Sequence, residues 1–394
     1  MNKHRMNKEL ISFAARLREI IQGGDVAPRR PDNAARSPYQ ESEFNSHALE
    51  LFTLQFAHNA AYRVICEARG LTPEIVEHWT QIPAMPTMAF KELDLTCIPP
   101  EERTAVFHSS GTTEQKPSRH FHNADSLAAY KASLWAGFER NVLGSADVSS
   151  ASSGETRGRT VLAPVFLTPP PAQAPHSSLV HMFETVRQKL GATQLVFFGQ
   201  VASNGAWTLD FDAALAAFSS RCQTPDARPL VLLGTAFSFV HLLDYLAERD
   251  LRVGLPAGSR VMETGGYKSR SRSMTKAELH ALITDWLGVP PQNVICEYGM
   301  SELSSQAYDG VRNAECGVRI LCFPSWARVR IISPETGREV ADGETGLIRV
   351  FDLANVYSVA AIQTEDLGIR RGEGFELLGR AQLAEPRGCS LMTA

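Results

Sequence analysis

The sequence predicts an α/β fold in which mainly parallel sheets are flanked by helices, followed by a small β-rich subdomain. Between residues 160 and 300, apolar runs of strand length alternate with helical patterns, as βαβ units require. From Val318 onward, runs such as ARVRIIS and GETGLIRVF are separated by a turn, which predicts an antiparallel or barrel-like arrangement. We expect an α/β core with an N-terminal helical segment over residues 1–317, the β-rich subdomain over 318–378 and a short tail over 379–394.

The composition excludes several classes of protein. Of the 394 residues, 44% are apolar and 21% are charged, as in average globular domains. The 39 basic and 43 acidic residues give a net charge of −4, so we expect no nucleic-acid or membrane partner. No apolar run approaches the ~20 residues that cross a bilayer. The seven cysteines include no C-x-x-C pair, which favours a cytoplasmic protein with small-molecule or protein partners.

The first third of the chain predicts helices joined by irregular segments. Apolar residues at helical spacing from Leu10 to Ile20 predict an amphipathic helix packed on the body. A polar stretch, Asp25 to Ser46, is expected to wrap over the surface. Thr72 has the character of an N-cap, with proline at the next position. Further helices are predicted at Ala48–Arg69, Pro73–Trp79 and Asp125–Arg140.

The middle of the chain predicts the α/β units. The Ser/Gly-rich stretch from Leu143 to Arg159 cannot bury enough apolar surface to order itself, so it predicts a mobile loop. In doubly wound sheets, ligands bind at the carboxyl ends of the strands, so polar motifs that follow strands are candidates for a site. Strands are predicted at TVLAPVFL, TQLVFFGQV, PLVLLGTAF, SRVMET and NVICEYG, and helices at SLVHMFETVRQKL, DFDAALAAFSS, SFVHLLDYLAER and TKAELHALITDWL.

The first candidate motif is the hydroxyl and glycine cluster Ser109–Thr113. Small residues let backbone amides approach an anion, and hydroxyls donate to phosphate oxygens. Lys116, Arg119 and His120 follow closely and add positive charge. An ordinary Ser/Thr turn explains the same residues.

Two further motifs follow predicted strands. Gly265 and Gly266 come directly after SRVMET, where bare backbone permits a flat ligand to lie close; a tight turn before a solvated helix is the alternative. Tyr298 and Glu302 follow NVIC, and there a tyrosine can stack on a base while a carboxylate can hold magnesium that bridges phosphates. A buried tyrosine beside an exposed glutamate explains this second motif equally well.

The last candidates lie near the C-terminus. Asp366 is a natural acceptor for two ribose hydroxyls, and Arg380 can bind ribose or phosphate oxygens; a surface ion pair is the simpler interpretation. Cys389 stands beside basic Arg387 in the tail, where an exposed thiol can accept an acyl group. A small buried hydrophobic residue is the alternative for this cysteine.

The joint order of these motifs resembles the adenylate-forming superfamily of acyl-CoA synthetases, adenylation domains and firefly luciferase. HSSGTT with SRH, SSLVHM, ETGGYKSRSR, EYGMSELSSQ and GRAQLAEPRGCSL resemble one branch more closely, the LuxE-like bacterial acyl-protein synthetases. The resemblance spans about residues 80 to 394. It implies the large N-terminal domain of an adenylate-forming enzyme, with the usual C-terminal small domain absent or vestigial. It also implies an ATP-dependent acid–thiol ligase.

The resemblance assigns roles to particular residues. Glu302 would bind Mg²⁺, His181 and Gly234 would lie near the carboxylic acid, and Cys389 would take the acyl group. Lys268, Lys116 and Arg119 are the candidates to neutralise the adenylation transition state, because a catalytic lysine of the usual small domain is missing. ATP would be bound by Ser109, Ser110, Gly111, Thr112, Thr113, Gly265, Gly266, Tyr298, Ser301, Asp366 and Arg380.

Two departures leave alternatives open. Glu114 and Glu365 stand where the superfamily usually has glycine, and a carboxylate at residue 114 would repel a triphosphate. The favoured function is activation of a fatty or other acid as its adenylate, followed by transfer to a thiol on Cys389 or on a reductase or acyl carrier protein. The alternatives are a CoA ligase of the phenylacetate-CoA ligase type, with CoA as a further cofactor, and a weakly active homologue that serves as a binding subunit.

Overall fold

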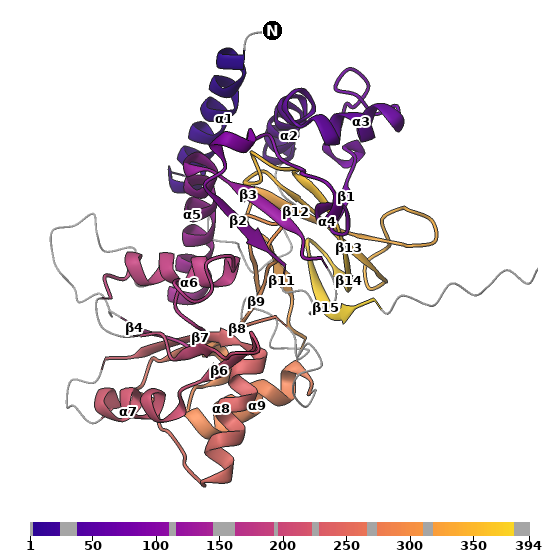
Figure 1. Cartoon of the computed structure of the whole chain (residues 1–394). Helices are drawn as coiled ribbons and strands as arrows, with labels where there is room; N and C mark the ends of the chain where they lie inside the picture. Colours follow the sequence, from indigo (N-terminus) through magenta and orange to yellow (C-terminus); the bar gives the residue numbers. More distant parts are fainter. Residues whose placement is uncertain are drawn as a thin grey trace, which may run out of the picture.

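The structure is a computed structural model. It describes residues 3–23, 38–109, 116–144, 162–192, 196–222, 228–265, 274–309 and 318–381. Among these residues, eleven strands form one large sheet, in the order β12-β13-β14-β15-β11-β10-β9-β8-β7-β4 with β1 beside β14. One half of this sheet is antiparallel, except that β1 runs parallel to β14, and the other half is parallel (Figure 1). The described residues form one hydrophobic cluster in the antiparallel half and one on each face of the parallel half.

The parallel half carries the predicted βαβ units. Its strands are buried on both faces, and alternate side chains point to opposite faces. Leu230 and Leu232 pack toward α7, α8 and α9, whereas Val231 and Leu233 pack toward α5 and α6. The strands are β4 (Ala163–Phe166), β7 (Leu230–Thr235), β8 (Arg260–Thr264) and β9 (Val294–Tyr298); the helices are α5 (Ala124–Phe138), α6 (Ser178–Lys189), α7 (Phe211–Cys222), α8 (Ala236–Glu248) and α9 (Lys276–Leu287).

The antiparallel half contains the stretch predicted to be β-rich, together with elements from earlier in the chain. The N-terminal helices α1 (Lys3–Gly23), α2 (Pro38–His58) and α3 (Ala60–Ala68) contribute to its core, beside the last strands of the chain (Figure 1). Its strands are β1 (Met85–Pro86), β10 (Ala307–Asp309), β11 (Leu321–Cys322), β12 (Ala327–Ile332), β13 (Thr345–Asp352), β14 (Ala361–Arg371) and β15 (Gly374–Arg380).

Two hairpins lie outside the large sheet. β2 (Ala105–His108) pairs with β3 (Arg119–His122), and β5 (Gly199–Val201) pairs with β6 (Trp207–Leu209). The short elements are α4 (Ala89–Glu92) and the single turns η1 (Trp79–Gln81), η2 (Pro100–Glu102), η3 (Glu139–Leu143) and η5 (Pro291–Asn293).

Most predicted elements are confirmed, and the differences have local causes. The predicted helix Ala48–Arg69 is two helices. The Asn59 side chain accepts a hydrogen bond from the Tyr62 amide at 3.1 Å, and this N-cap starts the second helix. The helix predicted at Pro73–Trp79 is wrong: that segment forms a turn, and His78 then caps η1. Part of the stretch expected to wrap over the surface is helical, since α2 begins at Pro38.

The strand predicted at TQLVFFGQV is the remaining difference. Among the described residues of this segment, only Gly199–Val201 forms a strand, and it pairs with β6. Phe197 adds a single parallel bridge to Phe166 of β4. A Cβ at Gly199 would lie 2.3 Å from the carbonyl carbon of Thr168. Residue 199 must therefore be glycine for this strand to lie so close to the segment that follows β4. The Ser/Gly-rich loop lies outside the described residues beyond Gly144. Within the part described, no helix is long and apolar enough to cross a membrane.

Candidate functional site

The candidate site lies where the two halves of the sheet meet. β9 ends the parallel half at Tyr298 and is followed by the turn that leads into antiparallel β10. The hairpin β2–β3 stands over this junction (Figure 1), and Ser118 at its base bonds to Glu302 in the turn. Four parts of the chain therefore meet at this junction: the carboxyl end of β8, the carboxyl end of β9, the hairpin β2–β3, and β14.

Glu302 is held by two hydroxyl groups. The Ser118 hydroxyl donates to Oε1 at 2.5 Å, and the Ser301 hydroxyl donates to Oε2 at 2.9 Å. Burial raises the pKa of Glu302, and these two hydrogen bonds oppose that rise. The Ser118 amide also donates to Oγ of Ser109 at 3.0 Å, so Ser109, Ser118 and Glu302 form one chain of contacts.

The turn that carries Ser301 and Glu302 is fixed from inside the protein. Asp352 is fully buried and accepts from the backbone amides of Ser304 and Ser305 at 2.9 and 2.8 Å. Asn355 donates to the Glu302 carbonyl at 2.8 Å. These contacts join residues about fifty positions apart, so they hold the turn against the end of β13.

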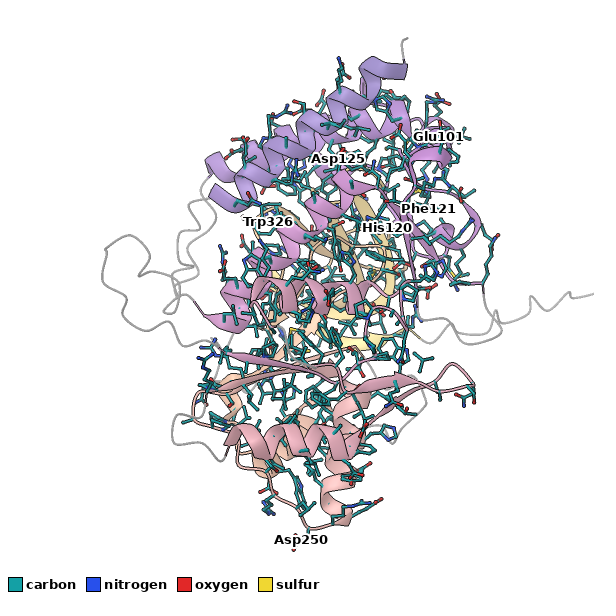
Figure 2. The ribbon with its side chains drawn as sticks, turned by 60° about the vertical axis from the view of Figure 1, so that its left-hand side comes forward. Glu101, His120, Phe121, Asp125, Asp250 and Trp326 are labelled. Carbon is teal, nitrogen blue, oxygen red and sulfur yellow. The ribbon has the colours of Figure 1, made fainter. Side chains whose placement is uncertain are left out.

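His120 supports the same turn from the other side. Its Nδ1 lies 2.6 Å from the Ser301 carbonyl oxygen and therefore donates the hydrogen bond. The ring is buried inside the molecule, on the strand that also carries Phe121 (Figure 2). Burial lowers the pKa of His120 to about 4, so the imidazole is neutral at pH 7 and supplies no positive charge there.

Tyr298 and Asp366 form the second part of the site. The Tyr298 hydroxyl donates to Oδ2 of Asp366 at 2.9 Å, and its ring packs edge-on against Phe375 with 5.3 Å between centroids. Burial raises the pKa of both Tyr298 and Asp366. Arg380 pairs with Asp366 in the strand register, but its guanidinium lies 3.3 Å from Glu365.

Gly265 marks the end of β8 and has a positive φ of 73°, which favours glycine. Lys276 at the start of α9 donates to the Gly265 carbonyl at 3.0 Å and to the buried carboxylate of Glu263. Burial would raise the pKa of Glu263, but Lys276 and His280 together bring it to about 2. Lys276 therefore places a cation beside this turn.

The predicted cations on the hairpin are engaged with carboxylates. Lys116 lies 3.2 Å from Glu92 at the end of α4, and Arg119 lies 2.9 Å from Asp94. To act on a phosphate, each cation would first separate from this carboxylate. Their catalytic role remains a prediction.

The two predicted acid-binding residues lie in different surroundings. His181 on α6 packs against Phe107 and Tyr130, with ring centroids 5.2 and 5.8 Å away. Gly234 on β7 is enclosed, since a Cβ there would lie 3.0 Å from Leu167. Several other predicted residues lie outside the described part of the chain: Ser110, Gly111, Thr112, Thr113, Glu114, Gly266, Lys268 and Cys389.

The described residues could bind magnesium only together with a substrate. No group of three or more His, Cys, Asp or Glu side chains gathers as a metal site among them. Mg²⁺ is commonly bound through one or two carboxylates together with phosphate oxygens of a substrate. Glu302, with one carboxylate fixed beside the predicted phosphate loop, matches that pattern.

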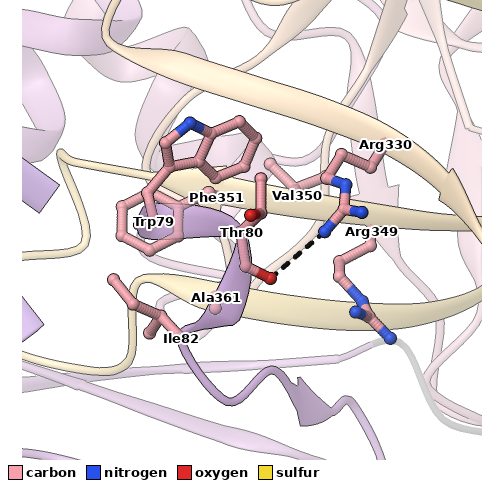
Figure 3. A pocket seen from close by; sticks show the side chains of 8 residues that line it. All are labelled: Trp79, Thr80, Ile82, Arg330, Arg349, Val350, Phe351 and Ala361. Carbon is pink, nitrogen blue, oxygen red and sulfur yellow. Dashed lines mark hydrogen bonds between the residues drawn. The ribbon is translucent and has the colours of Figure 1, made fainter. Parts of the chain in front are cut away.

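A separate pocket lies away from these residues. Trp79, Arg330 and Arg349 line it, and Arg330 donates to the Thr80 carbonyl at 3.2 Å (Figure 3). Burial, followed by the charge of Arg330, lowers the pKa of Arg349. None of the predicted site residues contributes to this pocket.

Comparison with known proteins identifies the family. Residues 185–394 match the family described as "Acyl-protein synthetase, LuxE". The chain belongs to this family. The Long-chain-fatty-acid--luciferin-component ligase of Vibrio harveyi is 22% identical over 349 residues, which cover 86% of this chain and 84% of that relative. The ligase of the same name from Aliivibrio fischeri is 28% identical over 181 residues, which cover 42% of this chain but only 46% of that relative.

Solved structures show the same fold. An open conformation of 2-Hydroxyisobutyryl-CoA Ligase in complex with 2-HIB-AMP and CoA is similar with a TM-score of 0.62 and 14% identity, over 91% of this chain and 80% of that one. Its postadenylation state with 2-HIB-AMP is also similar, with a TM-score of 0.62 and 13% identity, over 90% of this chain and 72% of that one. The predicted adenylate-forming fold is confirmed, and so is the predicted class, an ATP-dependent acid ligase.

Sequence reasoning missed the residues that hold the site in place. Four of these residues act through contacts about fifty or more positions away: Ser118, His120, Asp352 and Asn355. The fifth, Lys276, contacts Glu263 and Gly265 at the end of the preceding strand. Ser118 had a local signal, because it follows the Ser/Gly/Thr cluster within the same hairpin. Asp352 and Asn355 had none, since no motif connects them to Glu302.

Proposed function

We propose that this protein activates a carboxylic acid with Mg-ATP to form an acyl adenylate. The observation that carries the proposal is the position of Glu302, which both Ser118 and Ser301 bind beside Ser109, the first residue of the predicted phosphate loop. In the reaction, an oxygen of the acid's carboxylate attacks the α-phosphorus of ATP. The bond from that phosphorus to the bridging oxygen breaks, and pyrophosphate leaves.

The residues of the site have separate tasks in this proposal. Asp366 accepts hydrogen bonds from the ribose hydroxyls, and Tyr298, already bonded to Asp366, lies against the base. Glu302 would hold Mg²⁺, which supplies positive charge to the phosphates when it is bound. The Ser301 turn stays in place because Asp352, Asn355 and His120 fix its backbone.

The acyl group then passes to a thiol. The relatives are named long-chain-fatty-acid ligases, and their family is named for acyl-protein synthesis, which supports a fatty acid as substrate and a protein as acceptor. We propose Cys389 as the first acceptor. Its thiolate attacks the carbonyl carbon of the adenylate, a thioester forms and AMP leaves. A reductase or an acyl carrier protein is the expected final acceptor.

The intact mass of the protein tests this sequence of steps. The wild type and Cys389→Ala are incubated with Mg-ATP and a panel of carboxylic acids, and each sample is then treated with hydroxylamine. We expect an ATP-dependent increase equal to one acyl group, which hydroxylamine removes and which the variant lacks.

Other outcomes separate the alternatives. AMP that forms only when CoA is added, without any gain in mass, would assign a CoA ligase. No AMP with any acid, with or without CoA, would contradict acid activation and favour a binding subunit. A mass increase of equal size in Cys389→Ala would move the acyl group to another residue.

A further inference from the structure

A cluster of buried rings lies next to the site, on the inner face of the hairpin β2–β3. We call it the imidazole cluster: Phe107, His122, Tyr130 and His181. His122 packs on Phe107 with 4.5 Å between ring centroids and lies 6.0 Å from the ring of Tyr130. His181 contacts the same two rings from α6. The four side chains come from four elements, β2, β3, α5 and α6, and pack against one another.

Two nitrogen atoms in this cluster have no hydrogen-bond partner among the residues that the structure describes. They are Nε2 of His122 and Nε2 of His181, and both are buried. His122 is only 1% exposed, so its ring does not face bulk solvent. Buried polar atoms in folded proteins nearly always have partners, and each exception calls for an explanation.

The hydrogen bonds of Ser126 indicate what His122 requires. The Ser126 hydroxyl donates to the Asn123 carbonyl at 3.1 Å and accepts from the Asn123 amide at 2.8 Å. His122 Nδ1 lies 3.1 Å from the same oxygen, and because the Ser126 proton is already used, Nδ1 donates. A neutral imidazole that donates through Nδ1 has a lone pair on Nε2. That atom therefore requires a partner with a proton to give.

The charge state of His122 and His181 limits which chemical group can bind to them. Burial lowers the pKa of His181 to about 4. Burial, followed by the neighbouring His120 and His181, lowers the pKa of His122 well below its usual value. Both rings are neutral at pH 7, so they offer hydrogen bonds and no ionic attraction. A second carboxylate would have no proton to donate to His122, whereas a hydroxyl donates and accepts.

The position of the cluster relates it to the acid rather than to ATP. His120, which supports the Ser301 turn, is two residues before His122 on β3, and the two rings are in tilted contact with 4.5 Å between centroids. Two residues of a strand span about 7 Å. His122 pairs with Ala105 and His120 pairs with Phe107, so His122 lies farther along the hairpin from Ser109 than His120 does. We therefore relate His122 to the body of the acid and not to its reacting carboxylate.

We propose that His122 and His181 bind a hydroxyl group on the body of the acid, so that the preferred substrate is a hydroxylated acid rather than a plain alkyl acid. This inference rests on the proposed function and adds a substrate class to it. A plain methylene chain would leave both nitrogen atoms unpartnered. A hydroxyl donates to His122 Nε2, and its oxygen can accept from His181.

Matched pairs of acids test this inference. Acids of equal chain length, without a hydroxyl and with one at successive carbons, are compared by acid-dependent release of pyrophosphate and, without ATP, by titration calorimetry. The variants are His122→Phe, which keeps an aromatic ring of similar size, and His176→Phe as control. His176 is an exposed histidine near the same hairpin, bonded to the Val106 carbonyl through Nδ1.

We expect the wild type and His176→Phe to prefer the best hydroxylated acid over its plain partner by roughly tenfold in kcat/KM, mainly through KM. His122→Phe should bring this ratio close to one, because the preference for the hydroxylated acid is lost. Circular dichroism and thermal unfolding confirm that the variant is folded.

Several results would overturn the inference. One is a wild type that prefers plain acids; another is a His122→Phe variant that loses activity equally with both members of a pair, which would assign a structural role. If no acid releases pyrophosphate, the proposed function fails, and calorimetry alone decides. Tighter binding of hydroxylated acids by the wild type, lost in His122→Phe, supports the inference, whereas no binding at millimolar concentration contradicts it.

Discussion

Glu297 gives the protein a pH-dependent stability that can be worked out from its surroundings. This residue precedes Tyr298 on β9 and is almost fully buried, and its carboxyl group accepts a hydrogen bond from the Thr264 hydroxyl. Burial raises the pKa of Glu297 to about 7, against the opposing effect of Thr264. The ordinary value is 4.5, so between these pH values the folded protein keeps a proton that the unfolded chain has lost.

The sign and size of the effect follow from this difference. The folded state binds more protons in this window, so the free energy of unfolding falls as the pH rises. The interval from 4.5 to about 7, at ~1.36 kcal/mol for each pH unit, corresponds to about 3 kcal/mol. About 2.5 kcal/mol of this lies between pH 5 and pH 8. The stabilisation is present below pH 4.5 and is lost as the pH rises through about 7.

Urea unfolding at pH 5 and pH 8 tests the prediction with Glu297→Gln. Glutamine has the same shape, still accepts from Thr264 and cannot ionise. The difference in unfolding free energy, variant minus wild type, should therefore rise by about 2.5 kcal/mol from pH 5 to pH 8. The effects of all other groups cancel in this difference. Glu335→Gln, on an exposed turn, should follow the wild type. Parallel curves for Glu297→Gln and the wild type would refute the argument from burial.

Three further substitutions test the contacts of the site. Ser118→Ala leaves one oxygen of Glu302 without its donor, so we expect a loss of about 1–3 kcal/mol in unfolding free energy and a higher Mg²⁺ concentration for half-maximal turnover; an unchanged Mg²⁺ requirement would separate this contact from the metal. Asp352→Asn replaces a carboxylate that accepts from three backbone amides, those of Ser304, Ser305 and Ala354. Urea unfolding should show a loss of about 2–3 kcal/mol, and a loss below ~0.5 kcal/mol would count against its supporting role. Asp366→Asn should keep the contact with Tyr298 but raise the KM for ATP by roughly tenfold, and equal KM values would remove Asp366 from the ribose site.

The parts of the site that sequence could predict are those with a local signal. Tyr298, Glu302 and Asp366 each follow or occupy a strand in a motif of polar residues, and the structure brings Tyr298 into contact with Asp366 across 68 positions. The contact of Ser118 with Glu302 spans 184 positions, and no pattern in either segment connects them. The buried supports Asp352 and Asn355 depend in the same way on tertiary packing.

The fold follows the same rule. Long amphipathic patterns and fully apolar strands, such as those of α9 and β7, are confirmed because their apolar periodicity determines which faces are buried. The prediction of a helix after Thr72 was wrong. An N-cap residue and a proline favour the start of a helix, but the segment that follows is short and has few apolar residues to pack against the body. The TQLVFFGQV strand differs because Gly199 allows the chain to approach Thr168, and only the folded structure reveals that contact.

The central claim is that this site forms an acyl adenylate, and acid-dependent exchange of label between pyrophosphate and ATP tests it most directly. Because the step is reversible before the acyl group leaves, labelled pyrophosphate should enter ATP when protein, Mg²⁺ and a suitable acid are all present. Exchange should stop when the acid or Mg²⁺ is omitted, and Asp366→Asn should slow it. Exchange that does not depend on any acid, or no exchange across the plain and hydroxylated acids with folded protein, would contradict the account.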